Sequence, residues 1–171
     1  MTAVLSKSDI HQLIHHEPPL VESYIDLDRQ LQPNGIDLTL REVALLQTGG
    51  RITASNDQRI VSILAPLVFD GLGFVDLVPG AYLITLNEVV HLPLDLMALA
   101  RPRSSLLRCG VTVNTAVWDA GYSGRSQALL VVYNNQGFRL QRNASVMQLV
   151  FFRLTQATDG YCGVYQNENI T

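Results

Sequence analysis

Charged side chains are scarce in this sequence: Asp, Glu, Lys and Arg make up 16% of its 171 residues, against about a quarter in typical soluble proteins. A basic excess is also missing, because the net charge is −3. No apolar run approaches the ~18 residues of a membrane span, and no basic stretch leads from Met1 into an apolar core as in a signal peptide. We therefore expect neither nucleic acid nor membrane as a partner.

Cysteine is equally rare, and the two residues, Cys109 and Cys162, form neither a disulfide framework nor a CxxC pair. This usage predicts a reduced, cytoplasmic protein. The length predicts a single domain, 1–171. Because 47% of the residues are hydrophobic, the low charge indicates either a large core or buried subunit interfaces.

Only one helix is indicated, in an N-terminal segment that we place at 1–20. Ser6 and Asp9 resemble a capping box, Ile10 and Ile14 follow at helical spacing, and Pro18-Pro19 ends the segment. His11 and His15 lie four apart as metal ligands could, but no third ligand is nearby. A metal site there is not predicted.

Short β-type runs dominate the remaining sequence, and turn residues such as Pro79-Gly80 separate them. The expected strands are 36–40, 59–64, 82–86, 96–100, 111–117, 128–133 and 146–154. Many short strands with few helices favour an all-β fold, an antiparallel barrel or jelly roll.

Arginine is distributed unevenly along the chain. Residues 101–153 hold 7 of the 12 basic side chains and only one acid, Asp119. This cluster is either a solvated basic face or a site for a polyanion, because arginine binds phosphate through a planar fork of donors. The counts alone favour neither alternative.

The segment Arg101–Arg108 is the densest part of this cluster. It combines arginines with the adjacent hydroxyls of Ser104 and Ser105, which are donors suited to a triphosphate. Asp119 follows eleven residues after Arg108. An acid among arginines should stay ionised and could activate a water, although an Asp shortly before Gly121 is also a common turn residue.

Ordered motifs over nearly the whole chain resemble the dUTPase and dCTP deaminase superfamily. Leu5–Ile10 and Gln32–Leu38 are similar to N-terminal segments of the deaminase branch. Pro102–Leu106 resembles the phosphate-binding motif, Asp119–Gly124 the catalytic motif, and Val146–Phe151 a late strand. The resemblance implies a distorted jelly-roll barrel that assembles as a homotrimer with active sites between subunits.

The resemblance also implies a role for individual residues. Asp119 would be the base for the attacking water, and Tyr122 would pack under the deoxyribose. Asp37 would bind Mg²⁺ through water, and the hairpin around Asn114 would contact the base. The residues implied in phosphate or tail contacts are Arg103, Ser104, Ser105, Arg108, Gln148, Tyr161, Tyr165 and Gln166. The last three lie in a C-terminal tail, 155–171, that is a candidate lid although Val164 replaces an expected lysine.

One strand distinguishes the two branches of the superfamily. Deaminases use a glutamate there as a proton shuttle, whereas Gln127–Asn134 contains no carboxylate. We therefore predict a Mg²⁺-dependent hydrolase that cleaves dUTP to dUMP and pyrophosphate. The alternatives are a dCTP deaminase, alone or bifunctional with dUTPase, and a non-catalytic nucleotide-binding regulator.

Overall fold

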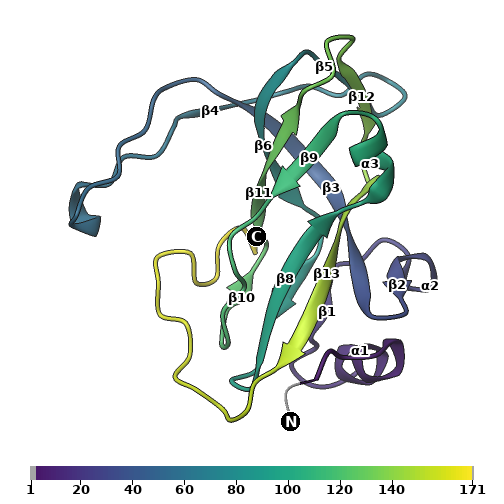
Figure 1. The fold of residues 1–171 in the computed structure, drawn as a ribbon, viewed down its shortest axis with the longest axis vertical. Coiled ribbons are helices and arrows are strands. Elements are labelled where there is room, and N and C mark those ends of the chain that lie inside the picture. The colour runs from purple at the N-terminus through teal and green to yellow at the C-terminus, as the bar shows by residue number, and fades with distance from the viewer. Residues whose placement is uncertain (1–2, 171) are drawn as a thin grey trace.

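A nearly closed antiparallel sheet forms the body of the computed structural model, which describes residues 3–170 (Figure 1). Residues 1, 2 and 171, at the outer ends of the expected N-terminal segment and tail, lie outside the described residues. The main strands in spatial order are β8 (Leu96–Pro102), β13 (Ser145–Arg153), β3 (Gly35–Leu46), β6 (Gly80–Leu86), β11 (Gln127–Val132) and β9 (Val111–Asn114). This arrangement confirms the all-β, barrel-like class predicted from the sequence.

Shorter pairs complete the β structure. β2 (Leu31–Gln32) and β4 (Leu64–Pro66) both pair with β3. The remaining strands are β1 (Val21–Glu22), β7 (Val89–His91) and β10 (Ser123–Gly124) in one small sheet, and β5 (Phe74–Leu77) with β12 (Phe138–Gln141) in another. The β7–β10 pair anchors the segment that follows Asp119.

The core lies inside the barrel, and the burial of each strand reflects its side-chain pattern. On β11 buried and half-buried residues alternate, as expected for a strand with one face on a core. The first half of β3 is buried at every position instead; it pairs with β13 and β2, and α1 and α2 both contact it. Full burial of Ile36, Leu38 and Leu40 makes β3 a central element of the fold.

The N-terminal helix α1 (Lys7–Ile14) begins where its capping residues predict. The amide of Asp9 donates to the Ser6 hydroxyl at 3.3 Å, and the Ser6 amide donates to the Asp9 carboxylate at 2.9 Å. The helix ends at Ile14, before Pro18. Ile10 and Ile14 are buried, so capping and packing both support the element.

Other elements depart from the expectations. The helices α2 (Leu27–Gln30) and α3 (Ser104–Arg108) were not predicted, and the strand expected at 111–117 ends at Asn114. The strand expected at 59–64 was wrong, because β4 begins only at Leu64. Residues 59–63 have too few backbone partners for a strand: only Ile60 forms a bridge, to Arg51.

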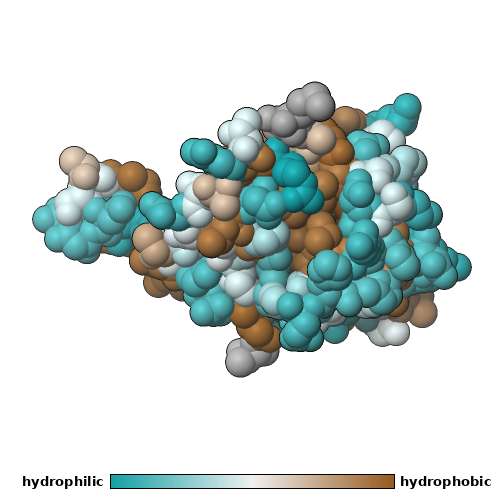
Figure 2. Space-filling model, turned by 90° about the horizontal axis from the view of Figure 1, so that it is seen from below, coloured by the Kyte–Doolittle hydropathy of each residue, from teal (hydrophilic) through white to brown (hydrophobic). Residues whose placement is uncertain are grey.

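These residues belong to an arm, residues 47–63, that projects away from the barrel between β3 and β4 (Figures 1 and 2). The arm contains the 3₁₀ turn η1 (Asn56–Gln58). Ile52, Val61 and Ile63 are exposed on it, Ile52 by 78%. A hairpin that extends from the body cannot bury these side chains against its own core.

The tail follows β13 and turns back along the barrel. It contains no regular strand within its described part, but Glu168 forms a parallel bridge with Gly124. This path brings the last residues of the chain beside the segment 119–125. No helix in residues 3–170 is long and apolar enough to span a membrane.

Candidate functional site

Asp119 borders a cavity of about 230 Å³ that we call the Asp119 pocket. The pocket is formed by the segment after β9, the start of β11 and the tail. Its lining residues are Ala116, Val117, Trp118, Asp119, Tyr122, Ser126, Gln127, Tyr161, Tyr165 and Glu168. Several elements distant in sequence therefore share one cavity.

The backbone around Asp119 is fixed on both sides. Trp118 exchanges two backbone hydrogen bonds with Ala98 of β8, at 2.9 and 3.1 Å. The amide of Tyr122 donates to the Asp119 carbonyl at 3.1 Å, which closes a turn through Gly121 at φ +78°. A positive φ favours glycine at this position. The turn leaves the Asp119 side chain exposed at the pocket.

Tyr122 is the aromatic centre of the pocket. Its hydroxyl donates to the Glu168 carboxylate at 2.8 Å and lies 3.0 Å from the Ser126 hydroxyl, which accepts from the Trp118 indole at 2.6 Å. Burial is the main cause that raises the pKa of Tyr122, so its hydroxyl stays protonated. Tyr161 meets the Tyr122 ring edge-on, with centroids 5.7 Å apart.

Gly124 provides the space for this arrangement. A Cβ atom at Gly124 would lie 2.5 Å from the Tyr122 hydroxyl and 3.2 Å from the Glu168 Cγ. Because these contacts are shorter than packed atoms tolerate, any side chain at this position would displace the ring or the tail. The glycine of the motif thus serves close packing in the pocket.

The tail is held to the segment 119–125 through both backbone and side-chain groups. The Asn167 amide donates to the Ser123 carbonyl at 2.7 Å, and the Arg125 amide donates to the Glu168 carbonyl at 2.9 Å. The Gln166 side chain adds two bonds, accepting from the Ser123 amide at 3.0 Å and donating to the Gly121 carbonyl at 2.9 Å. In this structure Gln166 therefore secures the tail.

Glu168 is a pocket residue that the sequence analysis did not select. Its carboxylate accepts from Tyr122, and burial, the largest cause, raises its pKa. Its position in sequence, 49 residues after Asp119, gives no indication that the two acids share a cavity. Tyr161 and Tyr165, which were selected, also line this cavity.

A second group of predicted residues gathers where β3, β8 and β13 run side by side. We call it the Arg103 patch: Asp37, Arg103, Ser104, Ser105 and Gln148. Asp37 and Gln148 are opposite each other in the ladder, and Arg103 forms an ion pair with Asp37. Ser104 and Ser105 are exposed in the first turn of α3.

Asp37 is the buried acid of this patch. Its side chain is 2% exposed, and its Oδ2 accepts from both Arg103 and the Gln32 amide. Its Oδ1 is buried without a hydrogen-bond partner among the described residues. Such an unpaired buried acceptor is costly, and it marks the place where an additional donor would fit.

The two groups do not meet within one chain. No Arg or Lys lines the Asp119 pocket, so the arginines do not surround Asp119 in the described protomer. Three of them instead pair with acids from earlier in the sequence: Arg103 with Asp37, Arg139 with Asp70 and Arg153 with Asp95.

Three predicted residues lie outside both groups: Gln166, which secures the tail, and Asn114 and Arg108. Asn114 is exposed at the end of β9, opposite Leu129. Arg108 is exposed at the end of α3 and donates to the Ser104 carbonyl at 3.3 Å. Their roles in substrate binding remain predictions.

A metal ion would find no preformed cage in the described part of the chain. Residues 3–170 contain no group of three His, Cys, Asp or Glu side chains placed to hold one. The rings of His11 and His15 lie 4.5 Å apart on α1. A hard cation that takes most of its ligands from a bound triphosphate and water needs only one or two protein carboxylates. The absence of a three-residue cluster in the described part of the chain is compatible with such a cation.

Comparison with known proteins gives consistent matches. Residues 4–154 match the family model described as dCTP deaminase-like. A protein of Methanosarcina mazei named "Probable deoxyuridine 5′-triphosphate nucleotidohydrolase" is 49% identical over 168 residues, covering 98% of each chain. A protein of the same name from Archaeoglobus fulgidus is 51% identical, again covering 98% of each chain.

A solved structure shares the fold. The 2′-deoxycytidine 5′-triphosphate deaminase from Agrobacterium tumefaciens superposes with a TM-score of 0.64 at 24% identity. The match covers 89% of this chain but 47% of that chain, so this chain spans about half the length of that deaminase.

Proposed function

The chain belongs to the dCTP deaminase-like family, and on this premise we propose that it is a cytoplasmic dUTP nucleotidohydrolase that releases dUMP and pyrophosphate. Its relatives at 49% and 51% identity are named for this activity, and each match covers 98% of both chains. The observation that carries the proposal is the pocket that joins the Asp119 carboxylate to the Tyr122 ring. A base for water and a flat apolar surface for a sugar are what this reaction requires.

In the proposed mechanism Asp119 takes a proton from a water molecule. The water oxygen bonds to the α-phosphorus while the bond from that phosphorus to the bridging oxygen of pyrophosphate breaks. Asp119 is suited to this task because its carboxylate is exposed and no arginine of its own chain lines the pocket to occupy it. Tyr122 stays neutral and positions the nucleoside.

The phosphates would bind at the Arg103 patch of a neighbouring subunit. Arg103, Ser104 and Ser105 provide the donors for them, and Asp37 orients Arg103 through the ion pair. Separation of the patch from the Asp119 pocket supports sites between subunits, because neither group alone contains both a base and cations. The exposed apolar side chains of the arm support a homotrimer, since assembly would cover them.

Mg²⁺ is the metal we propose, entering with the triphosphate. Asp37 would contact it through water on the side of its unpaired Oδ1, and the ion would neutralise charge on the phosphate oxygens. The ion pair between Arg103 and Asp37 orients both side chains within the chain.

Deamination of dCTP is the second candidate, favoured by one observation: Glu168 brings to the pocket the carboxylate that β11 lacks. That carboxylate, however, accepts a hydrogen bond from Tyr122, the residue on the sugar side of the proposed site. A proton shuttle must instead reach the base. Hydrolysis is therefore the better-supported reaction.

One assay separates the candidates. The protein is incubated with dUTP and with dCTP, with and without Mg²⁺, and pyrophosphate and ammonia are measured separately. We expect pyrophosphate from dUTP in the presence of Mg²⁺ and no ammonia. Ammonia from dCTP would establish the deaminase instead, and tight nucleotide binding without either product would establish a regulator.

A further inference from the structure

Most polar groups in the Asp119 pocket are already engaged. The Trp118 indole and the Tyr122 hydroxyl each bond to the Ser126 hydroxyl, and Glu168 accepts from Tyr122. Asp119 is the general base of the proposed reaction. Gln127 is the one amide side chain among the lining residues, and an amide oxygen can accept a hydrogen bond from a ligand without carrying a charge.

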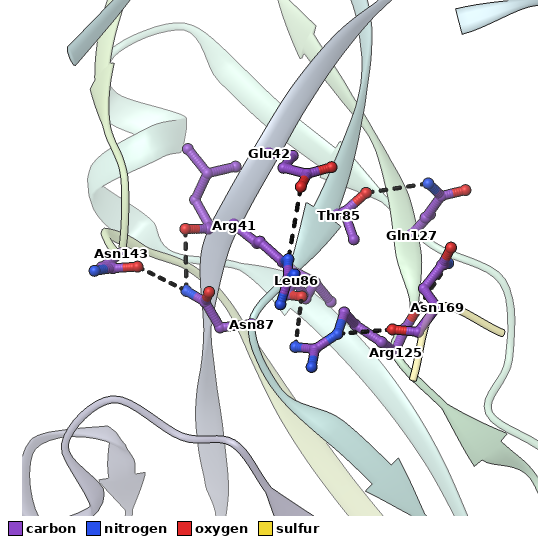
Figure 3. Close-up of polar contacts among 10 residues, drawn as sticks. Arg41, Glu42, Thr85, Leu86, Asn87, Arg125, Gln127, Asn143 and Asn169 are labelled. Carbon is purple, nitrogen blue, oxygen red and sulfur yellow. Dashed lines mark hydrogen bonds and ion pairs between the residues drawn. The ribbon is translucent and has the colours of Figure 1, made fainter. Parts of the chain in front are cut away.

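The Gln127 amide has one fixed contact. Its Nε2 donates to the Thr85 hydroxyl at 3.0 Å, across the β11–β6 ladder in which the two residues are direct partners (Figure 3). Thr85 is buried, whereas Gln127 is half-buried. Figure 3 shows the Gln127 Oε1 on the side away from Thr85, and Oε1 accepts no hydrogen bond within residues 3–170.

Gln127 is also at the junction of two cavities. It lines the Asp119 pocket and an adjoining cavity of about 340 Å³, whose wall includes Leu83, Leu64 and Ala116. A largely apolar space beside the Asp119 pocket is suited to a nucleobase, which needs apolar faces and a few polar groups at its edge. The Gln127 amide lies at such an edge.

Uracil and cytosine differ in the hydrogen-bond donors and acceptors along the edge of the ring. Uracil presents an acceptor at O4 and a donor at N3–H, whereas cytosine presents a donor at N4 and an unprotonated acceptor at N3. An amide oxygen fixed toward N3 would accept from uracil but would face a lone pair of cytosine. Discrimination of this kind needs an amide that cannot rotate freely.

We propose that Gln127 accepts a hydrogen bond from N3–H of the uracil ring, and that Thr85 is a positioning residue that holds the Gln127 amide in this orientation. The proposal rests on the proposed function and adds to it the side chains that select the base. It differs from the expectation for the hairpin around Asn114, because Asn114 does not line either cavity.

The test compares kcat/KM for pyrophosphate release from dUTP and from dCTP. Gln127→Leu should lower the dUTP/dCTP ratio by about 10- to 100-fold, because the acceptor for N3–H is lost. Thr85→Val should lower the ratio by several-fold, and Thr85→Ser, which keeps the hydroxyl, should restore it. A purely structural role of Thr85 would change both substrates alike and leave the ratio unchanged.

Gln136→Leu and Thr112→Val are matched controls, since both lie outside the two cavities, and both should keep the wild-type ratio. An unchanged ratio in Gln127→Leu would overturn the proposal while leaving the proposed function intact. If wild-type protein releases no pyrophosphate from dUTP, the proposed function fails instead. The ratio of the dissociation constants for the two triphosphates, measured by calorimetry in the same variants, then decides the base selectivity.

Discussion

The Asp119 pocket and the Arg103 patch differ in almost every physical property. The pocket holds two acids, an aromatic platform and no cation, and the tail covers one side of it. The patch holds an arginine with a buried counter-ion and two exposed hydroxyls. Each region supplies what the other lacks for a triphosphate, so the comparison suggests two halves of one site carried on different subunits.

β8 explains why one chain keeps the halves apart. Ala98 of this strand pairs with Trp118, the neighbour of Asp119, while Arg103 follows the other end of the strand at Pro102. At about 3.3 Å per residue, Ala98 and Arg103 are separated by roughly 16 Å. The strand is extended and fully paired to β13, so it cannot shorten this separation.

Replacement of the base should have the largest effect. Asp119→Asn is expected to leave nucleotide binding largely intact while kcat falls by about 10²- to 10⁴-fold, because the amide cannot accept the proton of water. Binding by calorimetry and turnover by pyrophosphate release check this. Asp28→Asn, at an exposed site on α2, is the control; full activity in Asp119→Asn would remove Asp119 from the mechanism.

Loss of the cation should be the next largest effect and tests the comparison directly. Arg103→Ala is expected to lower kcat/KM by about 10- to 100-fold, because a charge-assisted contact to phosphate is lost and Asp37 is left buried without its partner. Arg139→Ala removes an arginine that pairs with Asp70 on the surface and should change kcat/KM little.

Mixed assemblies then show whether the halves come from different subunits. Asp119→Asn and Arg103→Ala chains are co-assembled in equal amounts. Sites between subunits should recover about one quarter of wild-type activity, since half of the pockets and half of the patches are intact. No recovery above the separate variants would place both residues in the same site of one chain.

A smaller effect is expected from Glu168. Burial raises the pKa of Glu168 in the docked tail, so docking is favoured at low pH and weakens as the pH rises above the ordinary range of a glutamate. The protection factors for hydrogen exchange at the Arg125 and Asn167 amides, which bond across this contact, should therefore fall a few-fold as the pH rises. In Glu168→Gln the protection should not depend on pH; a pH dependence equal to wild type would show that another group controls docking.

The smallest effect on activity should follow a change outside both regions. Ser6→Ala removes the hydroxyl that caps α1 and should cost about 1 kcal/mol in the free energy of unfolding, measured by chemical denaturation. Both halves should keep their function, with kcat/KM for dUTP unchanged. A large loss of activity would show that α1 is coupled to one of the two regions.

Local patterns were sufficient for much of the fold. The Ser6–Asp9 capping pair and the apolar spacing behind it predicted α1, and alternation predicted the strand that starts before Leu38. The arm was mispredicted because β-branched residues at 59–63 look like a strand whether or not a partner is present. Strand pairing is a long-range property that local composition does not contain.

The residues of the candidate site likewise fall into those placed by local sequence and those placed by long-range contacts. Asp119 and Tyr122 are three residues apart, so the turn through Gly121 brings them to one pocket by local geometry. Gln127 lies in that pocket because Thr85 of β6 holds its side chain, and Glu168 lies there because the tail docks beside Gly124. Neither residue belongs to a pattern that could have identified it.

The sequence by itself determined the all-β class, the helix at the N-terminus and the concentration of seven arginines between residues 101 and 153 with one acid. Only the tertiary structure decided that no arginine of the same chain lines the Asp119 pocket. Arg103, Arg139 and Arg153 pair with Asp37, Asp70 and Asp95. The physical reason is that antiparallel pairing brings the acidic first part of the chain against the basic later part, and opposite charges that become neighbours form ion pairs.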